Sequence, residues 1–172
     1  MGTINKTTAA INSLLNNVED TGLQESAGDV IVGGLMYTAD GGIAKQYIYK
    51  GASASVKGEV VHPSLTTENA VTIETSEFDS VGVVYESGIE DGNLVWVVFS
   101  GSAYVLLEDT TATAYGNWVY ASAVDGRANG SLAQPAGGTI SALTDHFKEI
   151  GHSLDTQVGG TDVLAKIHIH FN

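Results

Sequence analysis

Short runs of apolar and β-branched residues, separated by Gly, Asp, Asn and Ser, fill the chain from residue 29 onward. Runs of this length between turn-forming residues are typical of β-strands. Expected strands cover residues 29–37, 45–50, 58–62, 70–75, 80–86, 93–100, 103–108, 117–122, 147–154 and 163–171. The pattern predicts an all-β domain over residues 29–172, either a small β-barrel or a β-sandwich of about 8–10 short strands.

The last of these runs alternates cleanly between apolar and other residues. Successive side chains of a strand point to opposite faces of the sheet, so one face should be buried. Apolar residues occupy one face, Val163, Ala165, Ile167, Ile169 and Phe171, and Leu164, Lys166, His168 and His170 occupy the other. We expect this segment to be the closing strand of the β domain.

The first 28 residues follow a different period. Ile11, Leu14, Leu15 and Val18 lie at i, i+3, i+4 and i+7, which predicts one short amphipathic helix in an N-terminal arm. Thr7 or Thr8 is available to cap it. The helix could dock on a neighbouring subunit or cover the sheet of its own domain, and both alternatives stay open.

Three segments share the pattern Gly-x-x-Val, beginning at Gly58, Gly92 and Gly116. Their unequal spacing argues against a repeat protein. In each we expect a Gly turn to begin a strand whose fourth residue points into the core. Residues 100–104 (SGSAY), between the second and third segments, predict a hairpin turn. Residues 125–146, after the third, predict a long surface loop, and loops of this length are often binding elements or contacts with another subunit.

Composition limits the possible functions. Twenty acidic residues against seven Lys and Arg give a net charge of −13, which disfavours binding to nucleic acid or to an anionic membrane. The chain has no Cys, so a disulfide framework, a thiolate metal site and a Cys nucleophile are excluded. The first residues do not read as an export signal, and no apolar run reaches membrane-spanning length. We expect a soluble protein that folds in a reducing cytosol.

His168 and His170 are the strongest candidates for metal ligands, because they share one face of a strand. Lys166 lies on the same face and would disfavour a cation. Further ligands would have to come from His62, His146, His152 or a carboxylate elsewhere. We therefore expect a half-exposed sheet face with no metal and no cofactor.

Other candidate sites are weaker still. Acidic residues pair at predicted strand ends and turns, where solvated acids are the default reading, in the groups Glu74, Glu77 and Asp79, Glu86, Glu90 and Asp91, and Glu108 and Asp109. The chain contains no Gly-x-Ser-x-Gly motif and no phosphate-binding loop. Aromatic residues in or beside the strands are expected to lie in the core, although they could form a glycan-stacking surface: Trp96, Tyr104, Tyr115, Trp118 and Tyr120. We expect no enzymatic activity.

The order of the motifs resembles that of the capsid decoration proteins of tailed bacteriophages, also called cement or head-stabilising proteins. The resemblance covers residues 56–171 and rests on the order of generic turn and strand signals. The matching positions are Gly58 and Val61, Val81, Gly82 and Val83, Gly92 and Val95, Ser100, Gly101 and Ala103, Gly116, Val119 and Tyr120, Ile150 and Gly151, and Gly159 and Gly160.

This resemblance implies a structural virion protein that trimerises, binds the capsid exterior and bridges subunits of the major capsid protein after synthesis in the host cytoplasm. It carries over no catalytic residues. By analogy, capsid binding is assigned to the N-terminal segment, at Ile4, Ile11, Leu14, Leu15 and Val18. The alternatives are a head-fibre protein of a virion, a carbohydrate-binding β domain and a His-based metalloenzyme.

Overall fold

The computed structural model describes residues 33–73, 79–131 and 148–170. The predicted N-terminal helix, with the proposed capsid-binding residues, and most of the predicted long loop lie outside these ranges. The described residues form strands and no helix, and so no helix among them could cross a membrane. The strands are β1 (Leu35–Tyr37), β2 (Gly42–Lys50), β3 (Val60–Pro63), β4 (Ala70–Thr72), β5 (Gly82–Val84), β6 (Leu94–Leu106), β7 (Trp118–Ala121), β8 (Ala128–Ser131), β9 (Glu149–Ser153) and β10 (Leu164–Ile169). The predicted all-β class is confirmed.

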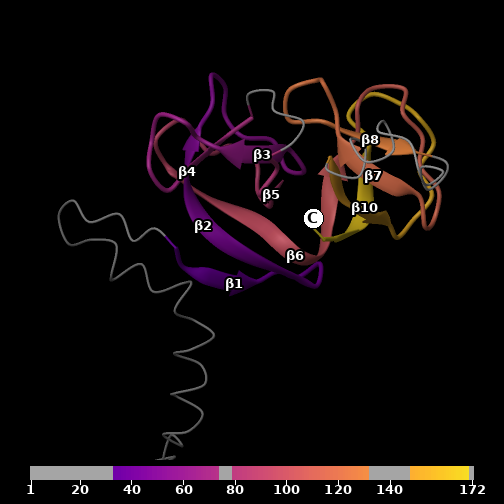
Figure 1. Ribbon diagram of the computed structural model, residues 1–172, viewed down its shortest axis with the longest axis horizontal. Helices are drawn as coiled ribbons and strands as arrows, with labels where there is room; N and C mark the ends of the chain where they lie inside the picture. Colours follow the sequence, from indigo (N-terminus) through magenta and orange to yellow (C-terminus); the bar gives the residue numbers. More distant parts are fainter. Residues whose placement is uncertain (1–32, 74–78, 132–147, 171–172) are drawn as a thin grey trace, which may run out of the picture.

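Five strands close into a barrel. The sheet runs in the order β1-β2-β4-β3-β5-β6-β10-β9-β7-β8, and a further pairing between β2 and β6 joins the ends of its β2-β4-β3-β5-β6 part. Only the β2–β4 pairing is parallel; the other strand pairs are antiparallel. β1 extends the sheet beyond the barrel as an edge strand on β2 (Figure 1).

β6 is the longest strand, with 13 residues, and it serves two parts of the fold. Its first half belongs to the barrel, and its second half pairs with β10, which continues through β9 and β7 to β8. We call the second half of β6 together with β10, β9, β7 and β8 the extension. Figure 1 shows β6 crossing the barrel and then bending into the extension.

The predicted hairpin turn at residues 100–104 is wrong, because β6 continues through it. Gly101 has a φ of +81°, a conformation that glycine adopts without steric cost. The strand bends there and keeps its partners, since Gly101 pairs with Gly42 of β2 on one side and Ile169 of β10 on the other. A bend sustained by both neighbours replaces the turn that the local sequence suggests.

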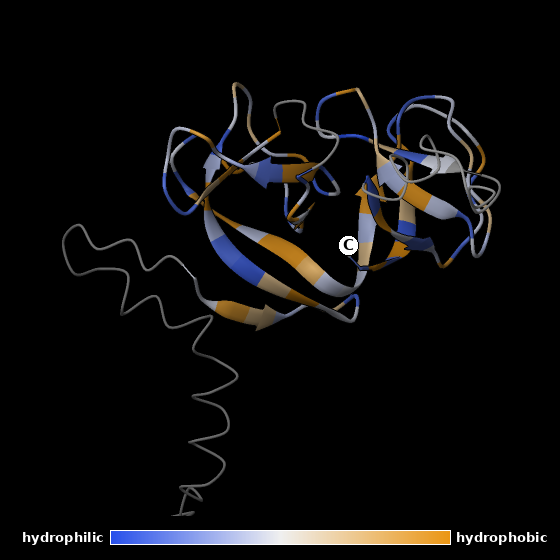
Figure 2. Ribbon diagram, viewed as in Figure 1, coloured by the Kyte–Doolittle hydropathy of each residue, from blue (hydrophilic) through white to orange (hydrophobic). Residues whose placement is uncertain are grey.

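Two groups of buried side chains make up the core. One, Tyr49, Val61, Val71, Val84, Val95 and Val97, is drawn from the barrel strands. The other joins barrel and extension, with Ala44, Val60, Val83, Val98, Ala103, Val105, Leu107, Val119, Ala121, Ala128, Ile150, Ala165, Ile167 and Ile169. In β6, buried positions alternate with partly exposed ones at Leu94–Val97 and Ala103–Val105, as expected where one face of a strand packs inward. Figure 2 shows hydrophobic stretches along β2 and β6.

The Gly-x-x-Val prediction is confirmed at all three places. Gly58, Gly92 and Gly116 have φ values of +93°, +81° and +81°. The fourth residues, Val61, Val95 and Val119, are each 0% exposed. A residue in the left-handed region therefore turns the chain, and the strand that follows directs its valine inward.

Other strand predictions need adjustment. β8 lies inside the segment predicted as a long loop, because Ala128–Ser131 pairs with β7. The aromatic residues expected in the core are not buried: Trp96, Tyr104, Trp118 and Tyr120 are partly exposed and Tyr115 is 75% exposed. Trp96 packs against the core from a partly buried position, and the interior is filled mainly by aliphatic side chains together with Tyr49.

Candidate functional site

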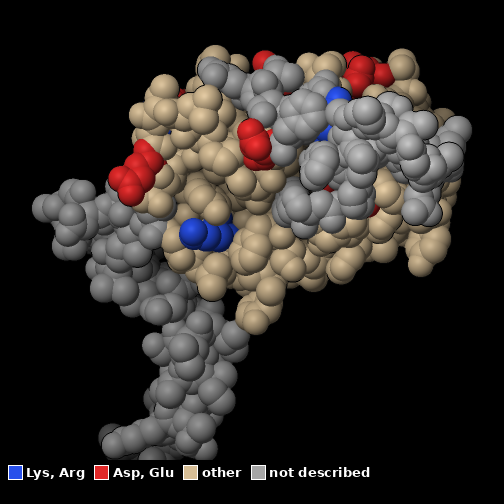
Figure 3. All heavy atoms as spheres, in the orientation of Figure 1, with Lys and Arg blue, Asp and Glu red and all other residues tan. Residues whose placement is uncertain are grey.

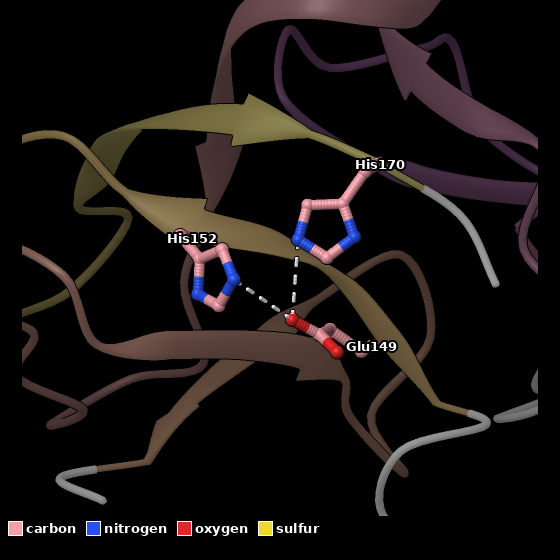
Figure 4. A group of neighbouring side chains, drawn as sticks. All are labelled: Glu149, His152 and His170. Atoms are coloured by element: carbon pink, nitrogen blue, oxygen red, sulfur yellow. Dashed lines mark ion pairs between the residues drawn. The ribbon is translucent and has the colours of Figure 1, made fainter. Parts of the chain in front are cut away.

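Glu149, His152 and His170 bring their polar atoms together on one side of the extension (Figure 4). Oε1 of Glu149 lies 3.4 Å from Nε2 of His152 and 3.3 Å from Nε2 of His170. The three ligand atoms all lie within 4.8 Å of one another. One carboxylate oxygen and two imidazole nitrogens thus converge on a common point.

An irregularity in β9 puts Glu149 beside His152. Residues three positions apart in a regular strand point to opposite faces of a sheet. Here Val119 pairs with Gly151 whereas the next residue, Tyr120, pairs with Glu149, so β9 contains one extra residue, Ile150. Such a bulge redirects the side chains on one side of it.

Gly151 makes the close pairing of β9 with β10 possible. A Cβ atom at this position would lie 2.1 Å from the carbonyl oxygen of His168. The amide of His170 donates to the carbonyl of Ile150 at 3.1 Å, which fixes the end of β10 against the bulge. The bulge, the glycine and this backbone bond together place the side chain of His170 over Glu149.

The aromatic rings of the cluster also contact one another. The ring centroids of His152 and His170 are 4.7 Å apart, and the edge-to-face contact of His152 with Trp118 has a centroid distance of 5.7 Å. Trp118 pairs with His152 across β7 and β9. These contacts limit the rotation of the His152 ring.

Burial is unequal within the cluster. The side chain of Glu149 is 1% exposed, whereas those of His152 and His170 are 39% and 36% exposed. A carboxylate taken out of water is costly unless a positive group compensates it. The two imidazoles supply that charge when protonated, or nitrogen lone pairs for a cation when neutral. From the open side, protons and small ions can reach the cluster.

The predictions for the C-terminal strand and its two histidines have different outcomes. β10 is the strand expected, with Ala165, Ile167 and Ile169 at most 2% exposed. His170 joins the cluster, whereas His168 is exposed and takes no part in it. His152, named among the possible further ligands, is the second histidine, and the carboxylate is Glu149.

The other histidines considered as ligands do not contribute. His62 is 5% exposed in β3, and burial lowers its pKa, against the raising effects of a hydrogen bond to the Asp79 backbone and of nearby carboxylates. Its Nδ1 has no hydrogen-bond partner among the described residues. His146 lies outside the described ranges.

Three of the candidate acidic residues, Glu108, Asp91 and Asp109, have structural partners. Glu108 accepts hydrogen bonds from Ser122 (2.6 Å) and Asn129 (3.2 Å). Two further candidates form ion pairs: Asp91 lies 3.2 Å from Lys50, and Asp109 lies 3.5 Å from Arg127, which also contacts Asp162 at 2.5 Å. Glu74 and Glu77 lie outside the described residues.

A second buried carboxylate, Glu59, was not anticipated. It is 8% exposed and accepts a hydrogen bond from the amide of Val56 at 2.8 Å. Burial raises the pKa of Glu59, and burial together with the Glu59 charge raises the pKa of Tyr49 to about 12. Because Tyr49 is 0% exposed inside the barrel, this pair is part of the core.

No protein-family model matches the chain, and no curated protein is significantly similar to it. Solved structures do match. One is the head fiber gp8.5 N base of bacteriophage phi29, with a TM-score of 0.50 and 12% sequence identity. The match covers 74% of this chain and 94% of the phage structure. At that identity the likeness is one of fold: the ten-stranded arrangement described above is similar to that of a phage head-fiber base.

Proposed function

We propose that the protein is a structural component of a phage virion that binds the exterior of the head and catalyses no reaction. The observation that carries this proposal is the fold shared with the head fiber base over nearly the whole of that chain. The order of turn and strand motifs in the sequence supports the proposal independently, because that order resembles a different class of phage head proteins, the decoration proteins. Both comparisons support a protein of the phage head, and we propose that it lies on the exterior.

The surface is compatible with this role. A net charge of −13 disfavours contact with packaged nucleic acid, and Figure 3 shows only separate, small groups of Lys and Arg on the described part of the face in view. Such a surface suits a protein partner and repels a polyphosphate.

β1 offers a place for that partner. Among the described residues it pairs with β2 alone, and its Leu35 and Tyr37 are 60% and 78% exposed. An edge strand with exposed apolar side chains can accept a further strand, gaining main-chain hydrogen bonds and buried apolar area. We propose that β1 helps the N-terminal arm to bind the major capsid protein.

At the finer level we favour a decoration protein that forms a homotrimer and bridges capsid subunits. The alternative is the base of a head fibre, and the similarity of fold to a head fiber base supports this alternative. The two differ in what binding does to the shell: a bridging protein stabilises the head, whereas a fibre base can attach without doing so.

The test is to mix the purified full-length protein with heads that lack it. We expect the protein to co-sediment with heads and to raise the temperature at which they release DNA. Co-sedimentation without a change in that temperature would identify a fibre base. If the protein does not co-sediment, the proposal is wrong.

A further inference from the structure

We propose that Glu149, His152 and His170 form a binding site for a divalent transition metal ion, preferentially Zn²⁺. Within the described ranges these three residues are the group of His and acidic side chains able to hold an ion. Neutral imidazole nitrogen and carboxylate oxygen are ordinary zinc ligands, and two His with one Glu is an established combination. The inference is independent of the role of the protein on a phage head.

The spacing of the carboxylate oxygen from each imidazole nitrogen fits tetrahedral coordination. An ion about 2.05 Å from each of its ligands has tetrahedral corners about 3.3–3.4 Å apart. The separations from Glu149 Oε1 to the Nε2 atoms of His152 and His170 are 3.4 and 3.3 Å. An octahedral ion with bonds of about 2.1 Å would require adjacent ligands about 3.0 Å apart, which disfavours Mg²⁺.

The site is prepared before an ion arrives. Glu149 lies at the bulge of β9, and its side chain is 1% exposed. Trp118 limits the orientation of His152, and the backbone bond from His170 to Ile150 fixes the third ligand. Ordered ligands lose little entropy on binding, which strengthens the affinity.

Charge favours the ion as well. A cation compensates the buried carboxylate of Glu149 without protonating either imidazole. Lys166, the basic residue expected to oppose a metal, is four positions before His170, about 13 Å along the strand. It is closer to His152, because His168, two positions after Lys166, pairs with His152. Its charge is therefore a cost to metal binding that ordinary salt screens in part.

Three protein ligands leave one tetrahedral position open, on the side where the two histidines meet solvent. In this arrangement the ion would join β9 to the residue that follows β10, and water would complete the coordination. A zinc-bound histidine usually donates a hydrogen bond from its other ring nitrogen to a carboxylate, a carbonyl or water, which strengthens the site. Nδ1 of His152 has no such partner among the described residues. We therefore expect micromolar affinity.

The experiment uses the full-length chain without a histidine tag, freed of metal with a chelator. Zn²⁺ binding is measured by competition with a fluorescent zinc indicator, with Mg²⁺ as the comparison ion. We expect one Zn²⁺ per chain, no response to Mg²⁺, and a rise of a few degrees in melting temperature with excess Zn²⁺. Removing a residue that only orients a metal ligand lowers zinc affinity by roughly 10–100-fold. H152A and H170A remove a ligand itself, so each should lower the affinity for Zn²⁺ by at least this factor.

His168→Ala is the matched control, because His168 lies two positions from His170, is exposed and is outside the cluster. It should bind Zn²⁺ as the unaltered protein does. Co²⁺ provides a second readout, since tetrahedral Co²⁺ absorbs visible light strongly and H170A should abolish that band. The assignment is overturned if the unaltered protein binds no Zn²⁺ at 100 μM, or if H168A weakens binding as much as H170A.

Discussion

The hydroxyl of Tyr49 lies 3.5 Å from Oε2 of Glu59, inside a barrel whose other described core residues are aliphatic. Because burial raises the pKa of Glu59, its ionised form is less favourable in the folded protein than in the unfolded chain. The stabilisation associated with a raised pKa is present at low pH and is lost as the pH rises through the folded value. Glu59 therefore opposes folding at neutral pH.

Glu59→Gln should relieve this cost. The amide oxygen of Gln can still accept the hydrogen bonds from Val56 and Tyr49, but it carries no charge. We expect the variant to be at least as stable as the unaltered protein at pH 8, with an advantage that shrinks toward pH 4. Urea unfolding midpoints across this range measure the difference; an advantage that instead grows on acidification would contradict the prediction.

His62 should produce the opposite pH dependence. Burial lowers its pKa from the usual value of 6.5, so its contribution to stability is present above that pH and is lost as the pH falls toward the lower folded value. His62→Gln, which keeps a polar side chain without titrating, should lose less stability between pH 7 and 5. Since all other titrating groups are common to both proteins, the difference between the two pH profiles reports His62. Parallel profiles would contradict this prediction.

Gly151→Ala should destabilise the extension by about 1–3 kcal/mol, the usual cost of overpacking, or more. The added methyl group would lie 2.1 Å from a backbone oxygen of β10, which cannot move without disturbing the β9–β10 pairing. Gly88→Ala is the control, because Gly88 and Gly151 both have a positive φ, +89° and +153°, but a Cβ at Gly88 meets no atom within 4 Å. Chemical denaturation should show a larger loss for Gly151→Ala; equal losses would mean that backbone conformation alone matters.

Charging the β1 edge should weaken binding to phage heads. The double variant Leu35→Lys, Tyr37→Lys keeps the strand but makes an added apolar strand unfavourable. We expect at least a roughly tenfold loss in co-sedimentation affinity, the scale of an interface hot spot. Leu65→Lys, at a residue 99% exposed away from β1, is the control and should bind normally. If both variants bind equally well, β1 is not a contact.

Alternation and turn chemistry predicted much of the fold. They gave the all-β class, most of the strands, the inward valines of the Gly-x-x-Val segments and the buried face of β10. They failed where tertiary pairing overrides a local signal. Gly101 reads as a turn, yet pairing of β6 on both sides turns it into a bend. β8 was hidden because Asn129 and Gly130, typical turn residues, pair with β7.

The candidate site was found in part for a similar reason. His170 was named as a weak candidate and His152 as a possible partner, but Glu149 was not. In a regular strand Glu149 and His152 would face opposite ways, and only the bulge at Ile150 brings them together. Gly151, a glycine inside an apolar strand, was the available signal, since such glycines often mark bulges or close backbone approach.

The sharing of β6 between barrel and extension has a consequence for how the protein folds. Neither part has a complete wall without this strand, so cutting the chain near Ser100 should leave two fragments that cannot fold separately, and the whole should unfold in one cooperative transition. Most pairings, such as Gly42 with Gly101 and Leu106 with Leu164, join positions far apart in the chain. Chains of this high contact order fold slowly, typically in milliseconds to seconds. Because one bent strand runs through both parts, we expect the barrel and the extension to fold together, slowly and in a single cooperative step.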